Sequence, residues 1–565
     1  RRSTDANPFP SIMGRVCPAP CEDGCNRNQV EDHVGINSVE QFIGDYGLDK
    51  KLTFDDIGAD TGKKIAIIGG GPAGLAAAYQ LRRKGHAVTL FDEREELGGM
   101  MRYGIPGYRT PRDVLDGEIK RIVDMGVETR MKTKVGVDVK IEDMEKEYDA
   151  ILWALGAQSG RPLPVEGAEA PNCLTGVDFL AAFNEGRLKL VSEKVLVIGG
   201  GDTSIDVASV ARRLGHITEI RDKDRPENIV LGHTAHDVAA SATRQGAKVI
   251  LMSRSPVEKM NAAEHEIKDA LREGVEVRGR LNPVAVIRAA DGRATALRVQ
   301  ELEEDGKTPI EGSEFDIEAD LIVSAIGQTG DMQGLEGFAN ERNLMDADQH
   351  YQVPGKPGHF VAGDIVRPHL LTTAIGQASI AVESIDHYLK HEDLKKRPKV
   401  DKHHFDLLAK LRETGLEPGQ FDVEERGDMR GTASSDWAVH NYEDRSKHEI
   451  VPSTKLFLGH FPYTDRVKRT EDVPSSAEVL GHFQERMQGL NTEQAQEEAK
   501  RCMSCGLCFE CDNCVIYCPQ DAIFRVKKGQ NTMGRYVDTD YAKCVGCHIC
   551  ADVCPTGYID MAMGE

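Results

Sequence analysis

The chain has 565 residues, of which 56 are glycine, and a formal net charge of −22 at pH 7. This length exceeds one compact core, and so much glycine excludes a single helical bundle. The acidic charge disfavours nucleic acid and anionic membranes as partners, because both repel a negative surface.

The longest stretch without a charged residue, residues 65–81, contains Pro72 and four glycines, so we do not expect it to span a membrane. The chain opens with Arg1, without an initiator methionine or an apolar leader, and we expect a fragment or a processed product. A reducing, cytoplasmic compartment suits its many thiols best.

The first predicted element is a buried strand at residues 64–68. It leads into Gly69-x-Gly71-x-x-Gly74 and then into a helix that ends near Arg83. In a dinucleotide fold, Gly69 makes the turn, Gly71 lets the backbone approach a pyrophosphate, and Gly74 lets the helix pack on the strand. A glycine-rich structural turn is the alternative interpretation.

Two further strands support the dinucleotide interpretation. The strand at residues 86–91 ends at Asp92, where a carboxylate can hold ribose hydroxyls. The strand at residues 148–155 ends in a small-residue turn at Gly156 and is predicted to be a crossover strand.

The strand–turn–helix pattern then repeats with variation. An apolar strand at residues 194–198 leads into a second turn, in which Ser204 replaces the third glycine. A small residue still permits close packing of helix on strand, so a second dinucleotide site is predicted. Its candidate residues are Gly199, Gly201, Asp202, Thr203 and Ser204.

Later strands resemble those around the first glycine turn. Residues 320–326 form an apolar strand that ends at Gly327, and the strand at residues 359–362 ends in Gly363-Asp364. Gly363 and Asp364 can close over the pyrophosphate and ribityl chain of a flavin. A small-residue helix at about residues 371–389 follows.

The chain becomes polar from residue 390 to about residue 474, which indicates a solvated connector. Helical patterning resumes at residues 476–501 and ends at Cys502. We expect this helix to present the C-terminal domain.

Eight cysteines near the C-terminus form C-x₂-C-x₂-C-x₃-C-P twice, which is the spacing of proteins that hold two 4Fe–4S clusters. Three closely spaced thiolates bind one cluster, while the fourth reaches the other cluster. The spacing therefore assigns Cys508, Cys511, Cys514 and Cys554 to one cluster, and Cys544, Cys547, Cys550 and Cys518 to the other.

Structural zinc and a disulfide framework are the alternatives for these cysteines, and the doubled run disfavours both. Cys502 and Cys505 extend the run upstream, so a register shifted by one cysteine stays open. The sequence assigns no role to these two residues.

Together these motifs, with Gly98-Gly99 and the run Arg102-Tyr103-Gly104-Ile105-Pro106, resemble the glutamate synthase small subunit and its relatives over about residues 10–390. In that family an FAD domain is interrupted by an NAD(P)H domain. The resemblance implies that cofactors are bound by the following residues of this chain: for FAD, Gly69, Gly71, Ala73, Gly74, Asp92, Gly98, Gly99, Arg102, Ile105, Gly156, Gly327, Gly363, Asp364 and Thr373; for the nicotinamide nucleotide, Gly199, Gly201, Asp202, Thr203, Ser204, Arg254 and Glu266.

The N-terminal piece with Cys17, Cys21 and Cys25 resembles half of the iron–sulfur segment that precedes FAD in this family and in dihydropyrimidine dehydrogenase. The resemblance implies one or two N-terminal 4Fe–4S clusters, with Glu40 near the position of a non-cysteine ligand. Buried structural thiols are the alternative.

The choice of nicotinamide is open between NADH and NADPH, with NADH somewhat favoured. Relatives that use NADP carry two arginines after the strand that follows the second turn, and only Arg254 matches here. Glu266 keeps the spacing of a glutamate that the relatives carry near this site.

The predicted fold is α/β, with two nested dinucleotide-binding, Rossmann-like domains, a helical N-terminal iron–sulfur segment and a C-terminal ferredoxin-like domain with two 4Fe–4S clusters. The predicted parts are 1–60 (iron–sulfur segment), 61–190 and 319–390 (FAD domain), 191–318 (NAD(P)H domain), 391–490 (connector) and 491–565 (ferredoxin-like domain).

This order of parts resembles NAD(P)H:acceptor oxidoreductases linked to dissimilatory sulfite reductase. The resemblance implies an enzyme that exchanges a hydride between nicotinamide and FAD and passes single electrons through the clusters. It implies a protein redox partner, either dissimilatory sulfite reductase or a ferredoxin, and leaves a homodimer open.

Several other functions remain open. The chain could serve as the small subunit of a glutamate synthase-like enzyme or as an NAD(P)H:ferredoxin oxidoreductase. It could reduce an organic substrate of its own, although no barrel-sized domain is present to hold one. A non-catalytic docking subunit is the last alternative.

Overall fold

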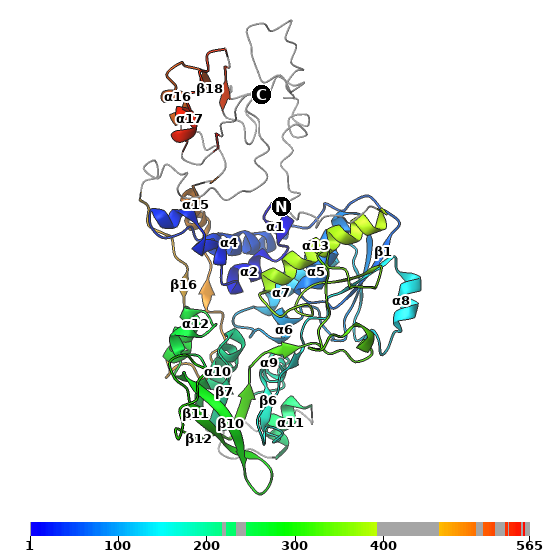
Figure 1. Ribbon diagram of the computed structural model, residues 1–565, viewed down its shortest axis with the longest axis vertical. Helices are drawn as coiled ribbons and strands as arrows, with labels where there is room; N and C mark the ends of the chain where they lie inside the picture. The colour runs from blue at the N-terminus through cyan, green and yellow to red at the C-terminus, as the bar shows by residue number, and fades with distance from the viewer. Residues whose placement is uncertain are drawn as a thin grey trace. The chain divides into compact units, whose positions relative to one another are not determined.

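The computed structural model describes residues 2–216, 222–232, 245–391, 463–503, 505, 512–525, 537–540, 542–554 and 558–559 (Figure 1). The chain forms two compact units. Unit 1 comprises residues 1–18, 40–398 and 469–489, and unit 2 comprises residues 19–39, 399–468 and 490–565. None of the described helices is long and apolar enough to cross a membrane.

Unit 1 contains two parallel five-stranded sheets, and a strand that enters a glycine turn lies at the centre of each. The first sheet has the order β15-β4-β1-β2-β3. Its inner strands are mostly apolar, because helices cover a parallel sheet on both faces. The five strands are β1 (Lys64–Ile68), β2 (Ala87–Phe91), β3 (Glu128–Arg130), β4 (Ala150–Trp153) and β15 (His359–Val361).

The second sheet has the order β6-β13-β7-β8-β9. Its strands are β6 (Cys173–Thr175), β7 (Lys194–Ile198), β8 (Lys248–Met252), β9 (Glu276–Arg278) and β13 (Leu321–Ser324). Strand β15 follows this sheet in the chain yet pairs with β4, so the first domain is interrupted by the second, as the sequence predicts. Strand β6 belongs to the second sheet although the predicted boundary stands at residue 190.

Smaller sheets accompany these two. An antiparallel sheet, β10-β11-β12, lies beside the second domain, and β5 pairs with β14. The strands are β5 (Ser159–Gly160), β10 (Leu281–Arg288), β11 (Ala294–Glu301), β12 (Phe315–Glu318) and β14 (Gln328–Thr329).

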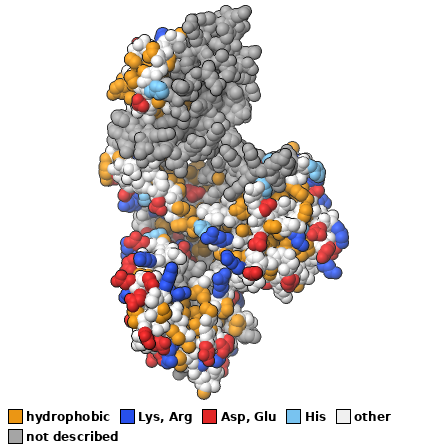
Figure 2. Space-filling view, viewed as in Figure 1, with side chains coloured by type: hydrophobic (Ala, Val, Ile, Leu, Met, Phe, Trp, Pro, Cys, Tyr) orange, Lys and Arg blue, Asp and Glu red, His pale blue; other side chains and the backbone are white. Residues whose placement is uncertain are grey.

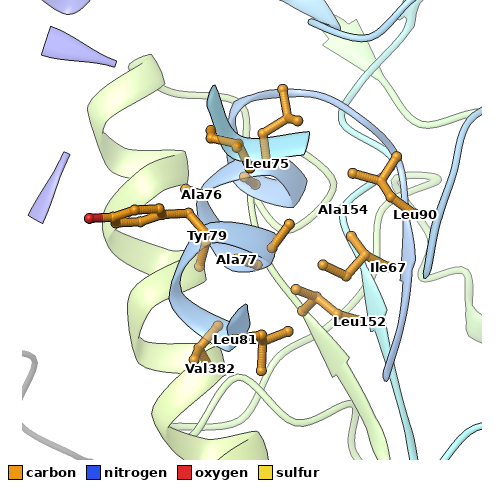
Figure 3. Close-up of a cluster of buried hydrophobic side chains, with 14 of the residues drawn as sticks. Ile67, Leu75, Ala76, Ala77, Tyr79, Leu81, Leu90, Leu152, Ala154 and Val382 are labelled. Carbon is orange, nitrogen blue, oxygen red and sulfur yellow. The ribbon is translucent and has the colours of Figure 1, made fainter. Parts of the chain in front are cut away.

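Helices α5 (Pro72–Arg83) and α13 (Leu371–Leu389) lie side by side on the first sheet (Figure 1). Ala76 and Ala77 of α5, and Ala378 and Ala381 of α13, are buried, and their small side chains let the helices approach closely. Figure 3 shows the core they enclose, which includes Ile67, Leu75, Tyr79, Leu81, Leu90, Leu152, Ala154 and Val382.

The other helices of unit 1 surround the two sheets. On the face seen in Figure 2, acidic and basic side chains are interspersed over this unit. The helices are α1 (Arg2–Ala6), α2 (Pro10–Val16), α6 (Met100–Tyr103), α7 (Arg112–Val123), α8 (Ile141–Glu147), α9 (Gly176–Asn184), α10 (Asp202–Leu214), η2 (Asp222–Asp224), α11 (Pro226–Val230), η3 (Val257–Lys259), α12 (Glu264–Arg272) and η4 (Glu336–Phe338), while α4 (Ile36–Asp49) has residues in both units.

Unit 2 combines an N-terminal piece with the C-terminal region. Strands β18 and β19 pair antiparallel, and helices α16 and α17 pack together. Its elements are α3 (Pro20–Asp23), η1 (Asn26–Gln29), α15 (Thr492–Lys500), α16 (Asn513–Ile516), β18 (Ile523–Arg525), β19 (Val537–Thr539) and α17 (Ile549–Asp552).

The helix predicted at residues 476–501 is shorter than expected. Only α15 is helical, and it begins after Asn491, whose side chain accepts a hydrogen bond from the backbone N–H of Gln494 in a capping box. Before it, Gly481 adopts φ +74°, and β16 (Thr470–Glu471) pairs with β17 (Met487–Gln488). Turn and strand pairing interrupt the helical pattern there. Most of the predicted connector, residues 392–462, lies outside the described residues.

Candidate functional site

The turn between β1 and α5 depends on its glycines. A β-carbon at Gly74 would lie 1.9 Å from the carbonyl oxygen of Gly69, and one at Gly69, where φ is +111°, would lie 2.2 Å from the carbonyl oxygen of Ala154. A β-carbon at Gly71 would meet only the Cα of Gly99, at an ordinary 3.7 Å. Gly69 and Gly74 are therefore required by the protein's own packing, whereas the missing side chain of Gly71 keeps space open.

That space belongs to a cleft of about 970 Å³, including its open mouth, at the carboxyl ends of β1, β2, β4 and β15. Ligands of open parallel sheets bind at this edge. The lining includes apolar side chains such as Ile68, Leu155 and Leu335, which suit a flat ring system. The predicted FAD residues that line the cleft are Gly69, Gly71, Ala73, Asp92, Gly99, Gly156, Gly363 and Asp364.

Two helix N-termini face this cleft. Pro72 and Ala73 begin α5, and Leu371 and Ala374 lie in the first turn of α13. Both helices are long enough to carry a positive dipole at that end, and their first N–H groups have no partner within the helix. Such ends favour a phosphate-bearing ligand.

Two carboxylates complete the lining. Asp92 accepts hydrogen bonds from the backbone N–H groups of Gly70 and Arg94, both at 2.7 Å, and burial raises its pKa. Burial raises the pKa of Asp364 to about 6. Together with the apolar walls and the helix ends, these acceptors for sugar or ribityl hydroxyls make the cleft fit FAD.

The second turn, between β7 and α10, has the same construction. A β-carbon at Gly199 would lie 2.5 Å from the carbonyl oxygen of Ala325, whereas one at Gly201 would meet nothing within 4 Å. Ser204 is fully buried, and its hydroxyl donates to the carbonyl oxygen of Gly201 at 2.6 Å. Serine therefore fits where the first turn needs glycine.

The two C-terminal cysteine runs fold alike where they are described. Asp512 precedes α16 with φ 63°, and His548 precedes α17 with φ 64°. Asp and His adopt this left-handed conformation more readily than most residues. The shared turn indicates an internal repeat.

The fourth cysteine of each run makes the same local contact. Cys518 Sγ accepts a hydrogen bond from the N–H of Ala522, and Cys554 Sγ accepts one from the N–H of Tyr558, both at 3.2 Å. Such N–H···S bonds stabilise thiolates that bind iron. Cys508 and Cys511 lie outside the described residues.

Comparison with known families agrees with this geometry. Residues 63–378 match the model of the pyridine nucleotide-disulphide oxidoreductases. The chain belongs to this family. Residues 501–558 match the 4Fe-4S dicluster domain, and residues 1–52 match the 4Fe-4S cluster domain II of dihydropyrimidine dehydrogenase. It is thus an NAD(P)H-dependent iron–sulfur flavoprotein oxidoreductase by family.

Named relatives share the family core. "Glutamate synthase (NADPH) small chain" of Mycobacterium tuberculosis is 33% identical over 68% of this chain and 78% of its own length. The "NAD-dependent dihydropyrimidine dehydrogenase subunit PreT homolog" of Salmonella typhi is 30% identical over 68% and 83%. The "NADP(+)-dependent formate dehydrogenase subunit beta" of Moorella thermoacetica is 31% identical over 67% of this chain, which spans only 54% of that subunit.

Other residues predicted to bind FAD do not line the cleft. Arg102 donates from Nε to the carbonyl oxygen of Leu97 at 2.6 Å and pairs with Asp116, so it supports the turn around Gly98. The Thr373 hydroxyl lies 2.8 Å from Nδ1 of His369. Those outside the lining are Gly74, Gly98, Arg102, Ile105, Gly327 and Thr373.

The sequence did not indicate a second side of the cleft. Lys134 lies there, with its Nζ 2.5 Å from an Asp331 carboxylate oxygen and 3.5 Å from one of Glu93. Gln333 and Leu335 line the cleft beside it. These residues come from loops that carry no motif, and only the fold brings them together.

Glu266, predicted near the nicotinamide, is paired inside the protein. Its carboxylate lies 2.9 Å from Arg109 and 3.8 Å from Arg486, and Arg109 also lies 2.8 Å from Asp206. Burial opposes ionisation of Glu266, but the two guanidinium groups hold its pKa below the usual value. Burial raises the pKa of Asp206 to about 6. Arg254 follows β8 and is exposed.

The N-terminal candidates divide between the units. Cys17 and Glu40 belong to unit 1, where Glu40 accepts a hydrogen bond from Asn7 at 2.7 Å and burial raises its pKa. Cys21 and Cys25 belong to unit 2. Among the described residues, no three His, Cys, Asp or Glu side chains are grouped closely enough for one metal ion. Thiolates on separate irons of a cluster need not converge so closely.

Proposed function

We propose that this chain exchanges electrons between NAD(P)H, FAD and 4Fe–4S clusters on one side and a redox partner protein on the other. One observation carries the proposal: residues 63–378 contain a single cysteine, Cys173. No dithiol can therefore accept electrons inside the flavin and nicotinamide domains. The cysteine-rich segments at both ends supply acceptors instead.

The residues of the cleft would hold FAD by complementary contacts. Gly71 gives backbone access to the pyrophosphate, the N-termini of α5 and α13 offset its charge, and Asp92 accepts from ribose hydroxyls. Asp364 would serve the ribityl chain. When bound, FAD takes a hydride from nicotinamide and releases single electrons, the form that clusters accept.

The nicotinamide nucleotide would bind at the second turn. Gly201 leaves open space for the pyrophosphate, and α10 presents its N-terminus through Asp202 and Thr203. NADH is proposed over NADPH because Arg254 is the one arginine that follows β8 directly.

For the partner, the order of parts favours a role like that of DsrL, the NAD(P)H:acceptor oxidoreductase linked to dissimilatory sulfite reductase. In that role, the sulfite reductase exchanges electrons with this chain. A ferredoxin is the second candidate partner, because it also exchanges single electrons. The similarity to a glutamate synthase small chain favours a different partner, the other subunit of a glutamate synthase-like enzyme. The 4Fe-4S dicluster domain supports a one-electron protein acceptor in each case.

The test is anaerobic turnover of the purified holoenzyme with each acceptor and with NADH or NADPH. We expect rapid nucleotide oxidation with sulfite reductase or ferredoxin, and loss of that oxidation in Gly201→Ala while FAD stays bound. Oxidation driven by a pyrimidine without a protein acceptor would instead support an enzyme with its own organic substrate. Absence of FAD from the purified protein would support a docking subunit.

A further inference from the structure

Residues 469–489, called the strap below, contact both nucleotide-binding domains of unit 1. The ends of the strap are held together, since β16 pairs with β17 and the N–H of Asp472 donates to the carbonyl oxygen of Arg486 at 2.8 Å. Val473 and Val479, between these ends, are buried. The strap is therefore packed onto the domains, although its sequence carries no nucleotide-binding motif.

Buried charge binds the strap to the NAD(P)H domain. Arg486 is 5% exposed, and its guanidinium group pairs with Asp269 of α12 and lies 3.8 Å from Glu266 on the same helix. Release of this arginine would leave buried charge without compensation, which is costly. The contact between the strap and α12 is therefore a strong one.

The backbone of the strap continues this attachment at α10. Arg213 of α10 donates to the carbonyl oxygen of His482 at 2.5 Å, and its own carbonyl oxygen accepts from the N–H of Gly481 at 2.8 Å. Directly after the helix, a β-carbon at Gly215 would lie 2.4 Å from Cδ1 of Leu480. The NAD(P)H domain thus has a glycine where the strap packs against it.

The strap is also bound to the FAD domain. Glu485, next to Arg486 in the chain, pairs with Arg15 of α2 at 2.6 Å. Helix α2 packs into the core of the FAD domain through Ile12 and Met13. Adjacent residues of the strap therefore hold elements of different domains.

Glu266 connects the strap to the FAD domain a second time. Arg109, in the loop before α7 of the FAD domain, lies 2.9 Å from the Glu266 carboxylate, which Arg486 also approaches. One carboxylate thus links a guanidinium group of the FAD domain to one of the strap. Residues that share such a network are energetically coupled, so a change at one of them alters the others.

We propose that the strap locks the NAD(P)H domain to the FAD domain in one orientation, with Arg486 as a positioning residue that acts through Glu266. Domains of one chain move relative to each other by default unless their interface is large and apolar. The strap opposes this movement with ion pairs to both domains. The relative orientation of the two glycine turns then depends on a segment that binds neither nucleotide.

The test is hydrogen–deuterium exchange of the full-length protein, followed by mass spectrometry, in Arg486→Ala. We expect exchange to rise about tenfold in residues 105–111 of the FAD domain as well as in the strap and α12, because coupling within one network is worth about this factor. Gln484→Ala is the matched control, since Gln484 is an exposed residue of the same strap, and it should leave exchange unchanged. A rise confined to the strap and α12 would overturn the proposal.

Two further variants guard against misfolding of Arg486→Ala. Asp269→Asn keeps the shape of the side chain and removes its charge, so the same three segments should exchange faster by a smaller factor, with an unchanged circular dichroism spectrum. Unchanged exchange at residues 105–111 would overturn the lock. In Glu266→Gln, adding Arg486→Ala should raise exchange at residues 105–111 no further, and additive rises would overturn the action through Glu266. These readouts use neither nicotinamide nor a redox partner, so failure of the proposed function would not alter them.

Discussion

Adding one methyl group to the first glycine turn should weaken FAD binding without disturbing the fold. At Gly71, φ is −82°, which alanine adopts freely, and the new β-carbon would meet only Gly99 Cα at 3.7 Å. Loss of a preferred N-cap glycine and the lower entropy of the unfolded chain nearly cancel. We therefore expect the stability of the apoprotein to change by less than about 1 kcal/mol.

The methyl group would project into the space that the FAD pyrophosphate needs. Overpacking by one methyl group costs about 1–3 kcal/mol, which weakens FAD binding by about 5- to 150-fold. The assay is flavin fluorescence during titration of apoprotein with FAD, with urea unfolding of the same sample. Gly201→Ala is the matched control, because it adds a methyl group to the equivalent position of the second turn.

Wild-type FAD affinity in Gly71→Ala would refute the assignment of the cleft, and so would equal weakening by Gly201→Ala. Gly74→Ala tests the opposite case, a glycine that the protein's own packing requires. Its β-carbon would lie 1.9 Å from the carbonyl oxygen of Gly69, so α5 must move off β1. We expect that variant to lose stability as well as FAD.

Two further predictions concern buried charges. Arg109→Ala removes the guanidinium partner of Asp206 and the nearer of the two guanidinium partners of Glu266, so urea unfolding should show a loss of about 3–5 kcal/mol. Lys120→Ala, in the exposed Lys120–Asp124 pair, should cost less than about 1 kcal/mol. Equal losses would contradict this account. Burial raises the pKa of Glu118 to about 8 although the N–H groups of Ser11 and Ile12 favour its ionised form. At pH values between the usual glutamate pKa of the unfolded state and the raised pKa of the folded state, the folded state binds more protons than the unfolded state. Thermal stability should therefore fall as pH rises from the usual glutamate range to about 8. Glu118→Gln should abolish that fall, and an unchanged profile would refute the assigned pKa.

Much of the nucleotide-binding architecture follows from sequence because local chemistry determines it. Strands β1 and β7 and helix α13 have the predicted bounds. Gly69 and Gly74 could be assigned because close backbone contacts exclude a side chain there. Such local constraints leave a pattern in the sequence.

Contacts between distant segments left no such pattern. Lys134 and Asp331 meet in the cleft only because two loops converge. The pairing of Glu266 with Arg109 depends on how α12 packs. Likewise, nothing in the spacing of Cys505 indicated that its Sγ lies 3.3 Å from the side-chain nitrogen of Asn26. The prediction of one helix over residues 476–501 was wrong before residue 492, because the pairing of β16 with β17 overrides the local helical periodicity.

The central claim is a relay from nicotinamide through FAD to the clusters. The most direct measurement is anaerobic titration of the holoenzyme with NADH, and separately with NADPH, while flavin absorbance and low-temperature electron paramagnetic resonance are recorded. The account predicts that substoichiometric nucleotide bleaches the flavin and that reduced-cluster signals appear with it. Flavin bleaching with clusters that stay oxidised, yet are reducible by dithionite, would contradict it.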